Sequence, residues 1–442
     1  MLKYSLMIKS SVLKNGLAIV LLPLPQFQST TLTLQILAGS RFEKENQKGA
    51  AHLLEHLTLK GTSSFKDKLA IAKFLDELGA RFSASTGKEL VEFYIKFGDA
   101  GSNLERAFHF LREVVFEPLL ETESLIVEKK VIQNEISADL DKPARIIHAA
   151  FNKLVWPDQR LGEDVAGELT DLEKITEEDL TSYRQQFFKP SRMVLGLAGN
   201  FDEEKALNLI QCLENYQNTP QKPKKNAPQL NLGSLVWIPR PHDKEMRFLL
   251  GFPGVSFNDK KYYPLILLST ILGGGRGSRL FQLIREKYGL VYDVGSFLKG
   301  YSDTGIFGIS GEVAEENLLK VTELIMEELA KIQKDKPFTK EELNLAKRKV
   351  KGRLALGLET PASLLNWYTP QFLLSKEIES FEDFCGRIDD VTESGLQKTS
   401  QETFFQGQPT FVFTSVKDYT TELSSRLGIK GASQESKIYP AS

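Results

Sequence analysis

The stretch KELVEFYIKFG, residues 88–98, decides the fold class because its residues alternate in character. Every second residue is apolar and the residues between are polar or amphipathic: Val91, Phe93, Ile95 and Phe97 against Glu92, Tyr94 and Lys96. Alternation with a period of two is typical of a half-buried β-strand. The stretch therefore predicts a strand in a sheet that has one wetter face.

Segments on both sides of this stretch add further strands. Asn15-Gly16, between two apolar segments, is a dipeptide that accepts the positive dihedral angles of a tight hairpin turn. TTLTLQILAG, residues 30–39, and RMVLGLAGNFD, residues 192–202, are two more strand candidates. We therefore expect the chain to open with strands and to return to a strand near residue 200.

Helical patterns lie between these strands. Apolar residues recur with helical spacing over four segments: residues 50–61, 66–79, 103–116 and 123–140. Thr176 and Asp179, three residues apart, form a capping-box arrangement at the start of another helix. The mixture of helix and sheet predicts an α+β fold.

A polar segment divides the chain, which at 442 residues exceeds a usual single core. NYQNTPQKPKKNAPQLNLG, residues 215–233, is rich in Pro, Lys and Asn, a composition typical of exposed linkers. The sequence predicts a first domain over residues 1–215 and a linker over residues 216–233. A second domain over residues 234–430 and a disordered tail over residues 431–442 follow.

The two halves echo each other weakly. HLLEH at residues 52–56 falls on ILGGG at residues 271–275, an offset of 219 residues, and Val131 falls on Val350. Where the first half has its metal-binding residue types, the second has Ile271, Gly274, Gly275 and Leu354. We predict two tandem homologous α+β domains, each a mostly antiparallel sheet with helices packed on one face, and a metal site in the first domain alone.

Composition excludes several classes of protein. Fifty-six basic residues against 58 acidic ones give a net charge of −2, so no global field favours nucleic acid or an anionic membrane. Two distant cysteines, Cys212 and Cys385, exclude a disulfide framework and a thiolate zinc site, and they fit a reducing compartment. No signal peptide and no run of about 18 apolar residues is found. We expect a soluble cytoplasmic protein.

The segment HLLEH carries the chemistry. Positions i and i+4 of a helix share one face, so His52 and His56 direct ring nitrogens at one point, as in a zinc pair. Glu55 lies near that face but offset from it, in position to act as a general base on a metal-bound water. A single histidine on an amphipathic helix is usually only half-buried or exposed, but this motif in a chain with five histidines favours a metal site.

A catalytic zinc needs three protein ligands and one open position. VEKKVIQNE, residues 127–135, places Glu128 and Glu135 two helical turns apart on one face. By spacing alone, either carboxylate is able to reach a metal held by another helix. The remaining histidines, His109, His148 and His242, have no comparable partners in the sequence, and we expect none of them to be a ligand.

The order HxxEH is the inverzincin signature. Six segments extend it: VLKNGLAIVLLPLP, LAGSRFE, KGAAHLLEHLTLKGT, VEKKVIQNEISADLDKP, LGEDVAGE and DLTSYRQQFFKPSRMVLGLAGNFD. In this order they resemble the pitrilysin, insulinase and mitochondrial processing peptidase family of zinc metallopeptidases. The resemblance covers most of the chain.

The resemblance implies a role for each residue of the motif. His52 and His56 would be zinc ligands, Glu135 the third ligand and Glu55 the base. Glu128 would be an outer carboxylate that orients a ligand, so its loss would weaken the site without abolishing it.

The second half also matches the family. LGGGRGSRLFQLIREKYGLVYDVGS resembles the segment in which an arginine and a tyrosine lie seven residues apart, here Arg285 and Tyr292. Peptide hydrolysis builds negative charge on the carbonyl oxygen, so the tyrosine would stabilise it and the arginine would anchor the substrate. The alternative is a surface arginine and a core aromatic residue.

One segment departs from the family. Where relatives have Asn-Ala in an edge strand, this chain reads RFSAST, with Ser83 in the place of the asparagine. In relatives an extended peptide adds to that edge as another strand. The resemblance therefore implies that Phe82, Ser83, Ala84 and Ser85 bind substrate, and that a contact at Ser83 is altered.

We expect a Zn²⁺-dependent metalloendopeptidase that hydrolyses peptides or unfolded polypeptides through a zinc-bound water activated by Glu55. Because relatives enclose substrate between four such domains, the resemblance implies a homodimer, or a heterodimer with a paralogue. Two other functions stay open: a non-catalytic partner subunit of a peptidase-like complex, and a zinc hydrolase that acts on a non-peptide substrate.

Overall fold

The computed structural model describes residues 8–140, 142–217, 227–243, 245–334, 337–429 and 432–433. The chain folds into two compact units, each assembled from separate segments of sequence. Unit 1 comprises Met1–Ser137, Asp164–Lys224 and Leu356–Glu379, and unit 2 comprises Ala138–Glu163, Lys225–Ala355 and Ser380–Ser442. No helix among the described residues is both long and apolar enough to cross a bilayer.

Unit 1 is built on a six-stranded sheet in the order β1-β2-β6-β3-β5-β4. Its strands are β1 (Lys9–Val12), β2 (Ala18–Pro23), β3 (Ser29–Ile36), β4 (Arg81–Thr86), β5 (Val91–Gly98) and β6 (Met193–Gly199). All neighbouring pairs are antiparallel except β2 with β6. The predicted hairpin joins β1 to β2, and Gly16 at its turn has a φ of 90°. The edge strand β4 pairs only with β5 in this sheet.

The alternation that predicted a strand is confirmed in β5. Val91, Phe93, Ile95 and Phe97 are buried in a large apolar cluster, while the residues between them are partly exposed. Helices cover this face of the sheet: α1 (Ala50–Leu57), α2 (Lys68–Leu78), α3 (Ala100–Phe116), α4 (Thr122–Leu140), α6 (Leu169–Lys174), α7 (Glu177–Phe187) and α8 (Glu203–Gln211). The predicted capping box of Thr176 and Asp179 begins α7.

Unit 2 repeats this plan with the sheet order β12-β7-β11-β8-β10-β9. Its strands are β7 (Leu235–Pro239), β8 (Met246–Pro253), β9 (Val291–Gly300), β10 (Gly305–Val313), β11 (Thr410–Ser415) and β12 (Ala432–Ser433). Its helices are α9 (Tyr262–Gly273), α10 (Leu318–Ala330), α11 (Lys340–Gly357), α13 (Phe381–Asp389), α14 (Glu393–Phe405) and α15 (Thr420–Leu427). A π-helical turn, Phe281–Lys287, precedes β9.

The order of elements supports the internal duplication. Apart from the outermost strands β1 and β12, the first sheet has the order β2-β6-β3-β5-β4 and the second the order β7-β11-β8-β10-β9. These two orders are the same when the strands of each half are numbered along the chain. The segment between β3 and β4 carries α1, and the equivalent segment between β8 and β9 carries α9. The predicted α+β class is confirmed, and both sheets are mostly antiparallel.

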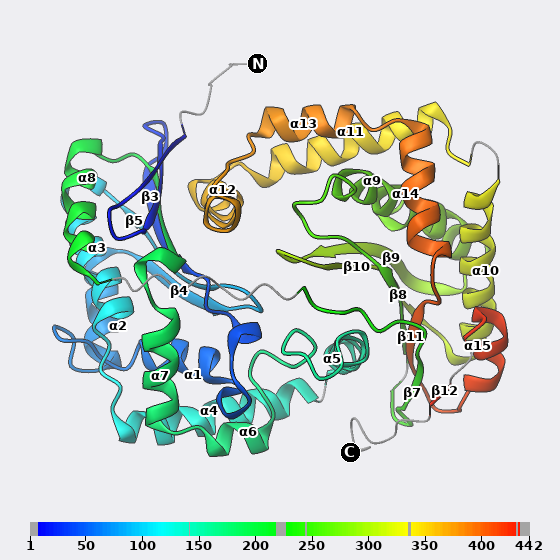
Figure 1. Cartoon of the computed structure of the whole chain (residues 1–442), viewed down its shortest axis with the longest axis horizontal. Coiled ribbons are helices and arrows are strands. Elements are labelled where there is room, and N and C mark those ends of the chain that lie inside the picture. The colour runs from blue at the N-terminus through cyan, green and yellow to red at the C-terminus, as the bar shows by residue number, and fades with distance from the viewer. Residues whose placement is uncertain are drawn as a thin grey trace. The chain divides into compact units, whose positions relative to one another are not determined.

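Each unit also contains a helix from the other half of the sequence. α12 (Pro361–Ser375) packs on β6, β2 and β3 of unit 1, and α5 (Pro143–Val155) packs on β11 and β8 of unit 2. Figure 1 shows α12 beside the sheet of unit 1, on the side away from α3 and α8. The sequence predicted helices on one face of each sheet only. The other face is covered by α12 in unit 1 and by α5 in unit 2, each of which comes from the other half of the sequence.

Glycines make room for the exchanged helices. A Cβ on Gly196 of β6 would lie 2.6 Å from Thr369 Cγ2 of α12. A Cβ on Gly251 of β8 would lie 2.1 Å from the Phe151 ring of α5. Because real Cβ atoms do not approach other atoms so closely, these positions need glycine for the helices to lie against the strands.

The predicted domain boundaries differ from the bounds of the two units at two segments: Ala138–Glu163 belongs to unit 2 and Leu356–Glu379 to unit 1. Part of the predicted linker, residues 227–233, lies against α5. Asn231 N donates to Val155 O at 2.8 Å, and Leu230 and Leu232 pack on the apolar cluster of unit 2. The rest of the polar stretch, residues 218–226, lies outside the described residues. The same holds for the predicted tail, except for residues 432–433, which pair with β7.

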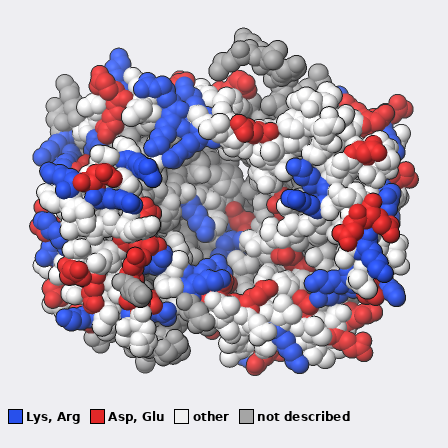
Figure 2. All heavy atoms as spheres, turned by 180° about the vertical axis from the view of Figure 1, so that it is seen from behind, with Lys and Arg blue, Asp and Glu red and all other residues white. Residues whose placement is uncertain are grey.

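Surface charge is balanced. Figure 2 shows acidic and basic side chains interspersed over the face in view, in keeping with the net charge of −2. The described residues on this face therefore offer no broad field of one sign to a charged partner.

Candidate metal centre

Contacts with other segments fix the N-terminus of helix α1, which carries HLLEH. Gly49 precedes it with a φ of 87°, and a Cβ there would lie 2.4 Å from Ala166 O. The carboxylate of Glu43 accepts hydrogen bonds from Gly49 N at 3.0 Å and Ala51 N at 2.8 Å. These N–H groups have no partner within the helix, and a carboxylate at a helix N-terminus satisfies them. The direction of α1 is thereby fixed.

The two histidines of α1 lie side by side. The ring centroids of His52 and His56 are 4.7 Å apart, with their planes at 76°. The buried leucines between them, Leu53 and Leu54, turn into the core, so the histidines face away from it. This is the arrangement that the i and i+4 spacing predicts.

Glu135 of α4 completes the cluster. Its Oε2 lies 3.8 Å from His56 Nε2. One ligand atom from each of His52, His56 and Glu135 lies within 4.8 Å of the others. Among the described residues, these three form the group of His, Cys, Asp and Glu side chains able to hold a metal ion. The structure thus brings together residues from two helices about 80 positions apart.

Glu128 lies in the same region but has other partners. Its Oε2 is 2.8 Å from His56 Nδ1, and its Oε1 pairs with the ammonium group of Lys60. Burial acts to raise the pKa of the Glu128 carboxyl, but Lys60 and His56 outweigh it and hold the pKa below the usual value. An ionised Glu128 accepts the Nδ1 proton of His56, which leaves Nε2 for a metal.

Spacing alone left Glu128 and Glu135 as equal candidates for the third ligand. The geometry separates them, because both oxygens of Glu128 are engaged and its side chain is only 4% exposed. The side chain of Glu135 is 50% exposed and faces Nε2 of His56. The structure therefore favours Glu135 as ligand and Glu128 as the group that orients His56.

Glu55 lies next to this cluster. Its Oε2 accepts a hydrogen bond from Thr86 Oγ1 at 2.5 Å, and Thr86 is the last residue of the edge strand β4. Burial is the largest influence on the Glu55 carboxyl and raises its pKa, while Thr86 and the charge of His56 act in the opposite direction. A carboxylate with a raised pKa is a stronger base, as general base catalysis requires.

The donor set fits zinc. Two imidazole nitrogens and one carboxylate oxygen are the ligands of one known class of catalytic zinc site, which keeps a fourth position open. The hydrogen bond from His56 to Glu128 is the outer contact that such ligands make. His52, His56 and Glu135 would hold the ion.

Arg285 and Tyr292 lie together in unit 2. The Arg285 guanidinium donates to the backbone oxygen of Tyr292 and lies 5.3 Å from the centre of its ring. It also lies 5.2 Å from the ring of Phe281. Arg285 belongs to the π-helical turn, a type of turn that is frequent at functional sites. Tyr292 is 68% exposed, so it is not the core aromatic residue of the alternative interpretation.

The predicted substrate-binding residues lie on β4. Phe82 and Ala84 pack against the core of unit 1, with the Phe82 ring 5.3 Å from that of Phe110. Ser83 and Ser85 alternate with them and so face the other side of the sheet. Because β4 is an edge strand, its backbone has hydrogen-bonding groups that no strand of this sheet pairs. These residues thus contribute backbone rather than large side chains.

The other histidines stay apart from the cluster. His109 lies exposed on α3, 3.8 Å from Glu105. His148 lies on α5 with its ring 6.2 Å from that of Phe297, and burial lowers its pKa, as does the charge of Lys299. Neither belongs to the metal-binding group.

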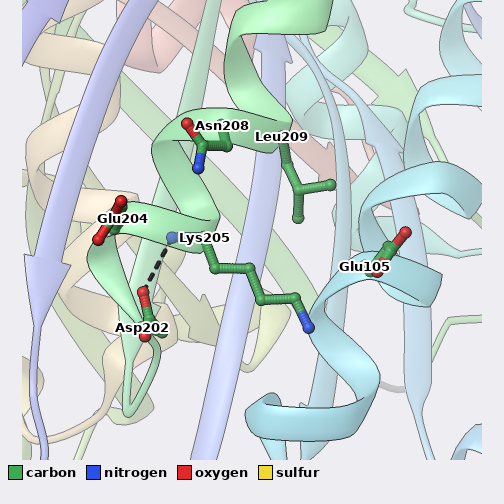
Figure 3. Close-up of a pocket in the computed structure, with 6 residues that line it drawn as sticks. All are labelled: Glu105, Asp202, Glu204, Lys205, Asn208 and Leu209. Carbon is green, nitrogen blue, oxygen red and sulfur yellow. Dashed lines mark hydrogen bonds between the residues drawn. The ribbon is translucent and has the colours of Figure 1, made fainter.

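A hollow of about 410 Å³ lies between α3 and α8 (Figure 3). It is open and lined by Glu105, Asp202, Glu204, Lys205, Asn208 and Leu209. The Lys205 ammonium group donates to Gly101 O at 3.2 Å, and Asp202 accepts from Lys205 N at 2.8 Å. The Asp202 contact caps the start of α8, and the Lys205 contact joins α8 to α3. No residue of the metal cluster lines the hollow.

Sequence reasoning missed three residues of the site: Glu43, Lys60 and Thr86. All three lie in or beside segments that it compared with the family, LAGSRFE, KGAAHLLEHLTLKGT and RFSAST. The sequence around them gives no signal that separates them from neighbouring polar residues. Their partners are distant in sequence, and only the fold reveals them.

Two family models match the sequence. Residues 19–168 match the model described as insulinase (peptidase family M16), and residues 174–350 match that described as the peptidase M16 inactive domain. An uncharacterized zinc protease of Bacillus subtilis is 30% identical over 90% of this chain and 96% of its own length. An uncharacterized zinc protease of Rickettsia felis is 32% identical over 80% of this chain and 84% of its own length.

Solved structures agree with the fold. A protease from Helicobacter pylori superposes with a TM-score of 0.84 at 22% identity, over 93% of this chain and 99% of that one. A structure from Pseudomonas fluorescens, described as a peptidase M16 inactive domain, superposes with a TM-score of 0.85 at 21% identity. The superposition covers 93% of this chain and 98% of that one. At such identity the likeness concerns the fold alone.

Proposed function

The chain belongs to the insulinase (M16) family of peptidases, and from this premise we propose that it is a zinc-dependent metalloendopeptidase with Glu55 as its general base. The observation that carries the proposal is the convergence of His52, His56 and Glu135, whose ligand atoms lie within 4.8 Å of one another. Glu55 adjoins them and has a pKa raised by burial.

Zinc in this cluster would acidify a water and polarise the carbonyl of the substrate. The residues of the chain supply the rest. Oε2 of Glu55 carries the hydrogen bond from Thr86, which leaves Oε1 to accept a proton from the attacking water. The water oxygen bonds to the carbonyl carbon, the C–N bond breaks, and Glu55 returns the proton to the leaving amine.

A non-catalytic partner subunit is the main alternative. The family description "inactive domain" applies to residues 174–350. Among the described residues, the group able to hold a metal ion is His52, His56 and Glu135, which lies outside that range. Ile271, Gly274 and Gly275 stand where the first half has its metal motif. The intact cluster in unit 1 supports activity for the chain as a whole.

Peptides or unfolded polypeptides are the proposed substrates. The free edge of β4 supports this, because an extended peptide is able to add to it through backbone hydrogen bonds with little demand on sequence. A non-peptide zinc hydrolase would not need such an edge. If substrate is enclosed, a folded protein will be cleaved more slowly than its unfolded form, and equal rates would contradict the enclosure.

We also propose that the chain works as a homodimer, in which Arg285 and Tyr292 of one subunit complete the zinc centre of the other. The exposure of Tyr292 supports a role at a site rather than in a core. Tyrosine would stabilise the charge that develops on the carbonyl oxygen, and arginine would anchor the substrate.

The test combines zinc content with digestion of a mixed peptide pool, run beside small esters and amides. Wild-type protein is expected to bind zinc and to cleave peptides, with activity lost to a chelator. Glu55→Gln should keep its zinc and lose about 10²- to 10⁴-fold in turnover. Glu135→Gln should lose zinc and activity together, and Glu123→Gln, at the exposed start of α4, should lose neither. Zinc-loaded wild-type protein without peptidase activity, or an active Glu55→Gln variant, would reject the proposal.

A further inference from the structure

Thr86 connects the edge strand to the proposed base. It is the last residue of β4, and its hydroxyl lies 2.5 Å from Oε2 of Glu55. Along β4, Thr86 shares the face of Phe82 and Ala84, both of which pack toward the helices. The hydroxyl thus reaches α1 from the strand, and it crosses 31 positions of sequence to do so.

The end of β4 is itself rigidly held. Backbone hydrogen bonds join the turn that follows it, residues 87–90, to residues 39–41: Ser40 N to Gly87 O, Arg41 N to Lys88 O and Gly39 N to Glu89 O. The side chains of Arg41 and Glu89 form an ion pair at 2.6 Å, with both about one-tenth exposed. Thr86 therefore occupies a fixed point from which to hold another side chain.

The side chain of Glu55 needs a contact that fixes its orientation. A glutamate side chain has three rotatable bonds, and fixing it costs conformational entropy. A hydrogen bond from a hydroxyl to a carboxylate is charge-assisted and short, as the 2.5 Å contact of Thr86 with Glu55 is, so it can hold the carboxylate in place.

We propose that Thr86 is a positioning residue that fixes the carboxylate of Glu55 in its orientation for proton transfer and ties the base to the strand on which substrate lies. This inference rests on the proposed peptidase function. Because this hydrogen bond joins Glu55 to β4 itself, the distance between the Glu55 carboxylate and a peptide paired with β4 would be constant.

The structure supplies a matched control. Thr33 of β3 also donates to a glutamate of the same sheet, with Thr33 Oγ1 3.0 Å from Glu92 Oε1. Thr33 is fully buried and lies outside the metal cluster. Thr33→Val and Thr86→Val therefore remove the same kind of hydrogen bond and leave the same side-chain volume, but only Thr86→Val releases the base.

The experiment measures kcat, KM, zinc content and the thermal midpoint for wild type, Thr86→Val, Thr86→Ser and Thr33→Val. Thr86→Val should lose about 10-fold or more in kcat, a part of what the base contributes, with zinc content unchanged and KM within about twofold. Thr86→Ser, which keeps the hydroxyl, should recover most of the loss. Thr33→Val should lower the thermal midpoint and leave kcat unchanged.

Three results would overturn the inference: a kcat for Thr86→Val within about twofold of wild type, no recovery in Thr86→Ser, or an equal loss of kcat in Thr33→Val. A double-mutant cycle of Thr86→Val and Glu55→Ala on thermal unfolding separates this inference from the proposed function. Non-additive effects are expected if the two side chains hold each other, and additivity rejects the inference whether or not the protein cleaves peptides. Inactive wild-type protein with a non-additive cycle would reject the peptidase function alone.

Discussion

Thr369 of α12 donates a hydrogen bond of 2.9 Å to Gln35 Oε1 of β3, although the two residues lie 334 positions apart. Thr369 is completely buried, and Gln35 in turn donates to Glu92 of β5 at 2.9 Å. This contact fixes the helix from the second half of the chain onto the first sheet. The sheet that positions the metal cluster therefore depends on residues from both halves.

Gly196→Ala should disturb this junction. The added methyl group would lie 2.6 Å from Thr369 Cγ2 and 2.8 Å from Leu365 Cδ2, so α12 or β6 must shift. Overpacking of this kind costs about 1–3 kcal/mol, and we expect a lower urea midpoint for unfolding. Gly386→Ala, at an exposed position of α13 with no atom within 4 Å of the added Cβ, should be neutral or stabilising. Equal midpoints for the two variants would contradict close packing of α12.

Glu128→Gln should weaken zinc binding without destroying the site. The substitution removes the charge that accepts the Nδ1 proton of His56 and leaves Lys60 without its carboxylate. Loss of such an outer partner costs about 10- to 100-fold in metal affinity. Competition with a chelator measures the affinity, and Glu123→Gln on the same helix is the control. An unchanged affinity would show that Glu128 does not orient His56.

Glu113 should make the stability of unit 1 depend on acid. Its carboxylate accepts hydrogen bonds from Thr62 Oγ1 at 2.7 Å, Ser64 Oγ at 2.7 Å and Ser64 N at 3.1 Å, which ties the loop after α1 to α3. Burial acts to raise the pKa of Glu113, but these hydrogen bonds outweigh it and lower the pKa below the ordinary value of 4.5.

A pKa lowered in the folded protein stabilises the fold above the pKa of the unfolded chain, and this stability is lost as the pH falls through the folded value. We therefore expect Glu113→Gln to lower the urea midpoint at pH 7 and to flatten its decline below a pH of about 4.5. Glu105→Gln, on the exposed face of the same helix, should follow wild type. Parallel declines in wild type and Glu113→Gln would rule out this role.

Mixed dimers test the shared active site. In the proposed mechanism, His52→Ala lacks a zinc ligand and Arg285→Ala lacks the substrate anchor, so each chain alone should be inactive. If the subunits exchange at random, half of the dimers are mixed and each has one complete centre, so the mixture should recover about a quarter of wild-type activity. Size determination of the wild-type protein checks that a dimer forms. A mixture that stays inactive although mixed dimers form would exclude sites shared between subunits.

Local features of this protein follow from its sequence because they depend on backbone geometry over a few residues. The alternation in residues 91–97 gives a strand with one buried face, and Asn15-Gly16 gives the hairpin before it. The i and i+4 spacing places His52 and His56 on one face of a short helix. The family, the α+β class and the chemistry of the motif are readable at this level.

The tertiary structure alone decided which groups meet across the chain. Glu128 and Glu135 share one helix face, and only the packing of α4 against α1, with Lys60 on one oxygen of Glu128, gives them different partners. The same holds for the exchange of α5 and α12 and for the contact of Thr86 with Glu55. Periodicity encodes which face of an element is apolar, but not which distant element covers that face, because that choice depends on the shape and polar partners of both.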